Sequence, residues 1–147
     1  MSSYKTVVVG TDGSDSSLRA VDRAGALASG PDAKVVVATA YFPSTDDSRA
    51  ADVLKDEAYQ VHGSAPTEEI LRTAKERAQN AGAKLIQQRP VKGAPVDALL
   101  QLVVDVKADL LVVGNKGLNT LSGRLLGSVP ADAARKAAVD VLIVHTT

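Results

Sequence analysis

The sequence has no cysteine among its 147 residues, no excess of one charge and no long hydrophobic run. Without cysteine there is no disulfide framework, no thiolate nucleophile and no thiolate metal site. Seventeen basic and seventeen acidic residues cancel at pH 7, so no overall field draws the chain to nucleic acid or to an anionic membrane. We therefore expect neither partner, and any anion that the protein binds must be held by local groups.

The apolar segments are short as well. Runs such as residues 7–9, 35–37 and 110–113 are far too short to span a bilayer. The first residues lead straight into a strand-like run, without the charged region and apolar core of a secretory leader. At 147 residues and 45% hydrophobic content, the chain fits one domain over residues 1–147. We expect a single-domain cytoplasmic protein.

Apolar runs alternate along the chain with segments of helical period. Consecutive apolar residues indicate strands that are covered on both faces, and the interleaved helices indicate an α/β protein. Pro66 and Pro95 suit helix starts, and Gly82 suits a helix end. The predicted strands are residues 4–10, 34–41, 84–91, 109–113 and 139–145; the predicted helices run from 14 to the Gly30-Pro31 pair, 66–80, 95–107 and 128–138, with a short one at 49–61 in a polar excursion.

These elements predict an open, doubly wound, five-stranded parallel sheet in the order 3-2-1-4-5, with helices on both faces. In that order the sheet reverses between the first and fourth strands. Ligands bind such sheets in the crevice outside the carboxyl ends of the strands at that point. Residues 10–14 and 114–117 follow these two strands, so we expect them to converge on one site.

The segment after the fourth strand has the residue types of an anion site. Gly114 directly follows a buried strand, where it allows close backbone approach to a ligand and a positive φ if the turn needs one, and Gly117 does the same. Ser128 is placed as an N-cap, whose hydroxyl and neighbouring amides can face a phosphate. The helix dipole adds about 0.3–1 kcal/mol for an exposed anion. Glycine and serine also occur here as ordinary loop residues, so it is the spacing that favours a site.

The spacing is Gly, two residues, Gly, nine residues, Gly and Ser, at Gly114, Gly117, Gly127 and Ser128. It resembles the motif of the nucleotide-binding branch of the universal stress protein family. The resemblance covers the whole chain, from the first strand and residues 10–14 to the last strand. It implies an adenine nucleotide ligand, namely ATP, AMP or cyclic AMP, with Mg²⁺ accompanying ATP. It also implies a stress-response sensor, reservoir or switch rather than an efficient catalyst.

The resemblance assigns roles to individual positions. The glycine loop and Ser128 match the phosphate contacts, and Asp12 matches an acidic residue near the ribose and adenine. A carboxylate can accept hydrogen bonds from both ribose hydroxyls, although Asp12 also suits a turn residue that caps its own loop. Main-chain groups around Thr39 and Ala40 match the adenine edge. Val9 and Val113 are placed to flank the base. The full implied set is Val9, Gly10, Thr11, Asp12, Thr39, Ala40, Val113, Gly114, Asn115, Lys116, Gly117, Gly127, Ser128 and Val129.

The last predicted strand suggests a homodimer. Residues 139–144 form a long apolar edge strand that a monomer would leave exposed. The family that the chain resembles also pairs through its last strand.

An enzyme is the alternative to a binding protein. Residues 11–16 resemble the pyrophosphate loop of ATP pyrophosphatases, but Asp12 stands where that loop has glycine, and its charge would repel pyrophosphate. A phospho-receiver domain needs an aspartate after the third strand and a lysine after the fifth, and residues 89–93 and 145–147 supply neither. His62 and His145 stand alone, and no serine has a histidine at motif spacing. We therefore expect no catalytic and no metal residues, and weak hydrolysis of bound ATP stays open.

Overall fold

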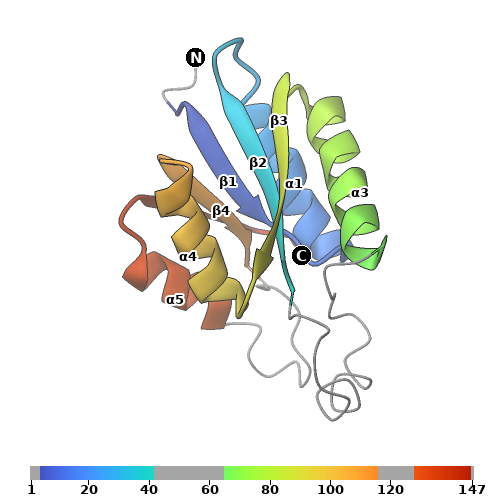
Figure 1. The fold of residues 1–147 in the computed structure, drawn as a ribbon. Helices are drawn as coiled ribbons and strands as arrows, with labels where there is room; N and C mark the ends of the chain where they lie inside the picture. The colour runs from blue at the N-terminus through green and yellow to red at the C-terminus, as the bar shows by residue number, and fades with distance from the viewer. Residues whose placement is uncertain (1–3, 42–64, 116–127, 147) are drawn as a thin grey trace.

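The computed structural model in Figure 1 describes residues 4–41, 65–115 and 128–146. Its five strands form one parallel sheet in the order β3-β2-β1-β4-β5. This confirms the predicted fold class and strand order, while the helix predicted at residues 49–61 lies outside the described residues. The strands are β1 (Thr6–Gly10), β2 (Lys34–Tyr41), β3 (Leu85–Lys92), β4 (Leu110–Gly114) and β5 (Asp140–Val144), and the helices are α1 (Asp15–Leu27), α3 (Ala65–Ala81), α4 (Pro95–Asp105) and α5 (Ser128–Lys136).

The central strands carry the apolar runs. Residues 7–9 of β1, 35–37 of β2 and 111–113 of β4 have no exposed surface. Helices cover both faces of these strands, which explains why their apolar residues are consecutive. The edge strands are more open: 47% of Leu85 on β3 and 43% of Ile143 on β5 are exposed.

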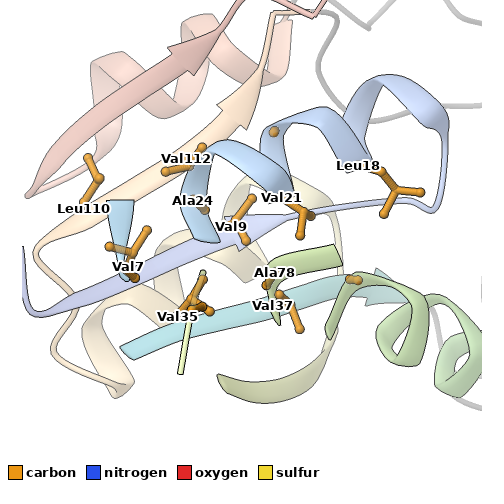
Figure 2. Close-up of a cluster of buried hydrophobic side chains, with 14 of the residues drawn as sticks. Val7, Val9, Leu18, Val21, Ala24, Val35, Val37, Ala78, Leu110 and Val112 are labelled. Carbon is orange, nitrogen blue, oxygen red and sulfur yellow. The ribbon is translucent and has the colours of Figure 1, made fainter. Parts of the chain in front are cut away.

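Helices α1 and α3 cover one face of the sheet, and α4 and α5 cover the other (Figure 1). The first face holds the larger core cluster, in which side chains of β1, β2 and β4 pack beneath α1 and α3 (Figure 2). Successive strand residues alternate between the two clusters, as Val7, Val8 and Val9 show. Among the described helices, none combines the length and the apolar character needed to cross a bilayer.

Small residues let α1 and α3 pack closely. A Cβ atom added at Gly25 of α1 would stand 2.7 Å from the carbonyl oxygen of Ala78 on α3. Beside this contact, Asp22 of α1 accepts a hydrogen bond of 2.9 Å from Nε of Arg77. That bond raises the pKa of Arg77 above its usual value.

Two helices end in the same way with different residues. Gly82, at φ 121°, ends α3, as its position in the sequence predicts. Lys107, at φ 56°, holds the corresponding left-handed position after α4. Helix α4 therefore ends at Asp105, slightly before the predicted boundary.

Candidate functional site

The carboxyl ends of β1 and β4 lie side by side at one edge of the sheet. The two strands pair in parallel, with Val9 opposite Val112, so the residues that follow them leave the sheet at the same edge. The chain adds β2 on one side of β1 and β4 on the other, so the strand order reverses here. The strand pairing thus confirms that the two strand ends meet as predicted; of the second predicted segment, residues 114 and 115 are described.

The loop between β1 and α1 is held together by its own side chains. Oδ1 of Asp12 accepts hydrogen bonds of 2.9 Å from the backbone N–H of Ser14 and from the hydroxyl of Ser17. Between them, Gly13 has φ 87°, a left-handed conformation that glycine adopts with little strain. Asp12 therefore caps its own loop, and its contact with a ribose stays a prediction.

Ser17, which the sequence analysis did not single out, stands at the centre of this loop. Its side chain is fully buried, its Oγ lies 2.7 Å from Oγ1 of Thr11, and it accepts the backbone N–H of Asp12 at 3.2 Å. Ser14 is the N-cap of α1 and accepts a bond from the backbone N–H of Ser17. The sequence signal that could have found Ser17 is its position three residues after the N-cap Ser14, where the partner of a capping residue stands.

Gly114, at the end of β4, lies close to Thr146 after β5 and to Ser16 of α1. A Cβ atom added there would stand 3.3 Å from Cγ2 of Thr146 and 3.8 Å from the carbonyl oxygen of Ser16. Its φ is not among the positive values. The glycine therefore packs closely against Thr146 on the α1 side, and the turn does not use the left-handed conformation that the sequence left open.

Asn115 follows Gly114 and is tied to the segment after β5. Its backbone N–H donates to the carbonyl oxygen of Val144 at 2.8 Å. Its side-chain oxygen accepts two bonds of 2.8 Å from Thr146, one from the backbone N–H and one from the hydroxyl. Thr146 is far away in the sequence and was not predicted.

The end of β2 reaches past the end of β1. The ladder between them ends at Gly10 and Ala38, with one further bond of 2.9 Å from the N–H of Thr11 to the carbonyl oxygen of Ala38. In a parallel strand the main-chain groups of every second residue point to the same neighbour. The N–H and C=O of Ala40 therefore point toward the edge beyond β1, and those of Thr39 point toward β3.

The start of α5 packs beneath the end of β4. Val129 and Val113 belong to the same core cluster, on the α4 and α5 face. Val9 lies in the cluster on the opposite face, so the structure does not bring together the two valines predicted to flank the base. Ser128 begins α5 as predicted. Lys116, Gly117 and Gly127 lie outside the described residues.

Within residues 4–41, 65–115 and 128–146, no group of three or more histidine or acidic side chains is arranged to hold a metal ion. The described part of the edge carries main-chain groups, the Asp12 carboxylate, serine and threonine hydroxyls and the Asn115 amide. Such a set suits a ligand that is recognised by hydrogen bonds.

Comparisons with known proteins agree with this architecture. The model of the universal stress protein family matches residues 3–145. A universal stress protein of Mycobacterium tuberculosis is 68% identical over 147 residues, which is 100% of both chains. A putative universal stress protein of Staphylococcus aureus is 32% identical, covering 99% of this chain and 87% of its own length. Among solved structures, a universal stress protein in complex with cAMP has a TM-score of 0.79 and 67% identity, covering 99% of this chain and 100% of that one.

The match to the family model spans nearly all of the chain, and the mycobacterial relative aligns with all of its 147 residues. The chain therefore belongs to the universal stress protein family.

Proposed function

We propose that this chain is a cytoplasmic protein that binds an adenine nucleotide, with cyclic AMP as the first candidate, at the edge between β1 and β4. The observation that carries the proposal is the relative that is 67% identical over 99% of the chain and was crystallised with cAMP. The neighbouring ends of β1, β2 and β4, with the start of α5 packed against β4, support it. The bound nucleotide would make the protein a sensor, reservoir or switch.

The main chain of β2 supports recognition of the base. The N–H and C=O of Ala40 form a donor and acceptor pair directed beyond the end of β1. Adenine offers an amino donor beside a ring-nitrogen acceptor, whereas guanine offers an oxygen acceptor in place of the amino group. A base held by Ala40 in a fixed register would therefore be adenine.

The two loops support the sugar and the phosphate. The bonds from Ser14 and Ser17 fix the direction of the Asp12 carboxylate, which then needs no reorganisation to accept a ribose hydroxyl. The first N–H groups of α5 have no partner within the helix and carry a partial positive charge of about half a unit. The single negative charge of cyclic AMP is the smallest that a nucleotide phosphate offers such a site.

We also propose that the nucleotide leaves the site unchanged. A serine nucleophile needs a free hydroxyl and an adjacent base. Here the hydroxyl of Ser17 bonds to Asp12, that of Ser14 caps α1, and that of Ser16 lies 2.6 Å from the Thr146 hydroxyl. These structural roles speak against a serine nucleophile, and the Asp12 carboxylate, where the pyrophosphate loop has glycine, disfavours the pyrophosphatase alternative.

Calorimetric titration with cyclic AMP, AMP, ATP and GTP tests the proposal. We expect the best adenine nucleotide to bind at least about tenfold more tightly than GTP, since a base in the wrong register leaves polar groups of the site unpaired. The nucleotide recovered after titration should be unhydrolysed. Equally weak binding of all four compounds would contradict the proposal.

We further propose that two copies pair through β5. The described sheet ends at β5, on which Ile143 is 43% exposed. An apolar edge strand of this kind favours pairing with a second copy. Light scattering should report a dimer for the wild type and a monomer for Ile143→Lys, while Val104→Lys, at a 63% exposed position on α4, serves as the control that stays dimeric. A wild-type monomer, or loss of the dimer in the control alone, would refute pairing through β5.

A further inference from the structure

Thr146, just after β5, is a buried polar residue whose hydrogen-bonding groups are all used. Only 4% of its surface is exposed. Its N–H and its hydroxyl both donate to Oδ1 of Asn115 at 2.8 Å. Its carbonyl oxygen accepts a bond of 2.7 Å from Nη1 of Arg19. Its hydroxyl lies 2.6 Å from that of Ser16, and because the Thr146 proton is directed to Asn115, Ser16 is the donor.

These contacts join two structural units. Asn115 is the first residue after β4, whereas Ser16 and Arg19 lie in the first turns of α1, directly after the Asp12 loop. The described pairing between β1 and β4 ends at Val9 and Val112, before either loop begins. Past that point, the described bonds that hold Asn115 next to α1 run through Thr146.

Gly114 belongs to the same arrangement. The atom closest to a Cβ at this position would be Cγ2 of Thr146, at 3.3 Å. A separation of that size is tighter than an ordinary van der Waals contact, so a side chain here would push on Thr146. A side chain at Gly114 would therefore require Thr146 to move by a few tenths of an ångström, away from the position in which it bonds with Asn115.

We infer that Thr146 is a positioning residue of the nucleotide site: it holds the end of β4 at a fixed place relative to the Asp12 loop and thereby sets nucleotide affinity from the far end of the chain. The inference rests on the proposed function, because affinity is the property that Thr146 is said to control. It assigns Thr146 no contact with the nucleotide. It also implies that Gly114 acts on the site through Thr146.

The first test compares Thr146→Val with Thr146→Ser. Valine keeps the shape but removes the hydroxyl, whereas serine keeps the hydroxyl and removes the methyl group. Coupling of this kind changes affinity by about 3- to 30-fold, so we expect titration with cyclic AMP to show that loss for valine and an affinity within about twofold of wild type for serine. Equal affinities of the wild type and Thr146→Val would overturn the inference and leave the proposed function standing.

Hydrogen exchange of the nucleotide-free protein separates positioning from general destabilisation. In Thr146→Val, the amide of Asn115 should exchange faster than in the wild type, while the amide of Val8 in the centre of the sheet should not change. Thr146→Ser should leave both amides unchanged. Equal acceleration at Val8 and Asn115 would mean a global effect and would overturn the inference.

A double variant tests the path through Gly114. We expect Gly114→Ala to weaken cyclic AMP binding by more than about tenfold, because the new methyl group displaces Thr146. Adding Thr146→Ser removes the opposing methyl group and keeps the hydroxyl bonds, so the double variant should recover most of the affinity. If it stays as weak as Gly114→Ala alone, the alanine methyl group blocks the ligand directly and the inference is wrong. A wild type that binds none of the nucleotides would instead refute the proposed function, and the inference with it.

Discussion

The loops that follow β1 and β4 reach the same edge of the sheet, but they are held by different kinds of contact. In the loop after β1, the bonds from Asp12, Ser14 and Ser17 join residues two to five positions apart. At the end of β4, Asn115 is held by Thr146, 31 positions away, and Thr146 in turn contacts Ser16, 130 positions away. The first loop is built from its own sequence, whereas the second depends on the completed fold.

This difference separates two ways of preparing a binding site. A loop with local partners is held in shape by contacts within a few residues of the chain. A loop end with distant partners depends on the segments that supply them, so its position responds to changes elsewhere. The Asp12 side of the edge should therefore be the rigid part, and the Asn115 side the part whose position can be altered from a distance.

Among the variants that test this comparison, Asp12→Ala is expected to lower stability the most. The variant removes both hydrogen bonds that Oδ1 accepts, so the free energy of unfolding should fall by about 1–3 kcal/mol. Binding of AMP should also fall, because the loop loses its shape and the ribose loses its acceptor. Urea denaturation and calorimetry measure the two effects. An unchanged free energy of unfolding would show that the loop does not depend on its own side chains.

The two glycines of these loops should differ in their tolerance of alanine. At Gly13, with φ 87° and a Cβ position 3.1 Å from Cγ1 of Ile70, alanine should destabilise the fold by about 1–2 kcal/mol. At Gly114, where φ is not positive, the loss should stay below about 1 kcal/mol, with the main effect on nucleotide affinity. Denaturation curves of both variants decide this, and a larger loss at Gly114 would reverse the comparison.

Asp12→Asn separates the two roles of Asp12. The amide oxygen still accepts the bonds from Ser14 and Ser17, so stability should change by less than about 0.5 kcal/mol. The charge that would bind the ribose is lost, and AMP affinity should fall by about tenfold or more. The same substitution should lower the affinity for 2′-deoxy-AMP by a smaller factor, because this nucleotide lacks one of the ribose hydroxyls. Asp105→Asn, at the exposed end of α4, is the control, and equal losses for both nucleotides would exclude a ribose contact.

The smallest change in stability and in nucleotide affinity is expected from Arg19→Ala. Arg19 contributes one bond to Thr146 from an exposed side chain. Removal of such a group should change the free energy of unfolding by less than about 0.5 kcal/mol. Cyclic AMP affinity should stay close to that of the wild type. An effect as large as that of Thr146→Val would show that the charge, rather than the buried hydroxyl, holds Thr146 in place.

Much of the fold was predictable because its signals are local. Consecutive valines in β1 and β2 indicate strands buried on both faces, and Gly82 marks the end of α3, so these elements were placed to within a few residues. Right-handed crossovers then leave few strand orders, and the one proposed is confirmed. The predicted end of α4, at residue 107, lies two residues beyond the observed end at Asp105, since lysine in the left-handed region has no sequence signature.

The candidate site was predictable to a smaller extent. Asp12 was singled out as a residue that caps its own turn, and the helix after it was placed to begin near Ser14, because turn and capping residues act on their immediate neighbours. The pattern of residues 114–128 placed one side of the predicted site at the carboxyl end of β4, but it did not show that a side chain at Gly114 would meet Thr146. Nor did alternation along β1 and β4 suggest that Val9 and Val113 would lie on opposite faces, since that depends on the register between the strands.

From its amino-acid order alone, this chain specifies an α/β sheet, the ends of its strands and a capped turn at Asp12, because periodicity and capping involve residues a few positions apart. The bonds among Thr146, Asn115 and Ser16, and the direction in which Ala40 presents its main chain, arise once the strands have paired. Contacts across 31 and 130 positions have no local pattern, since chain folding rather than spacing brings their partners together.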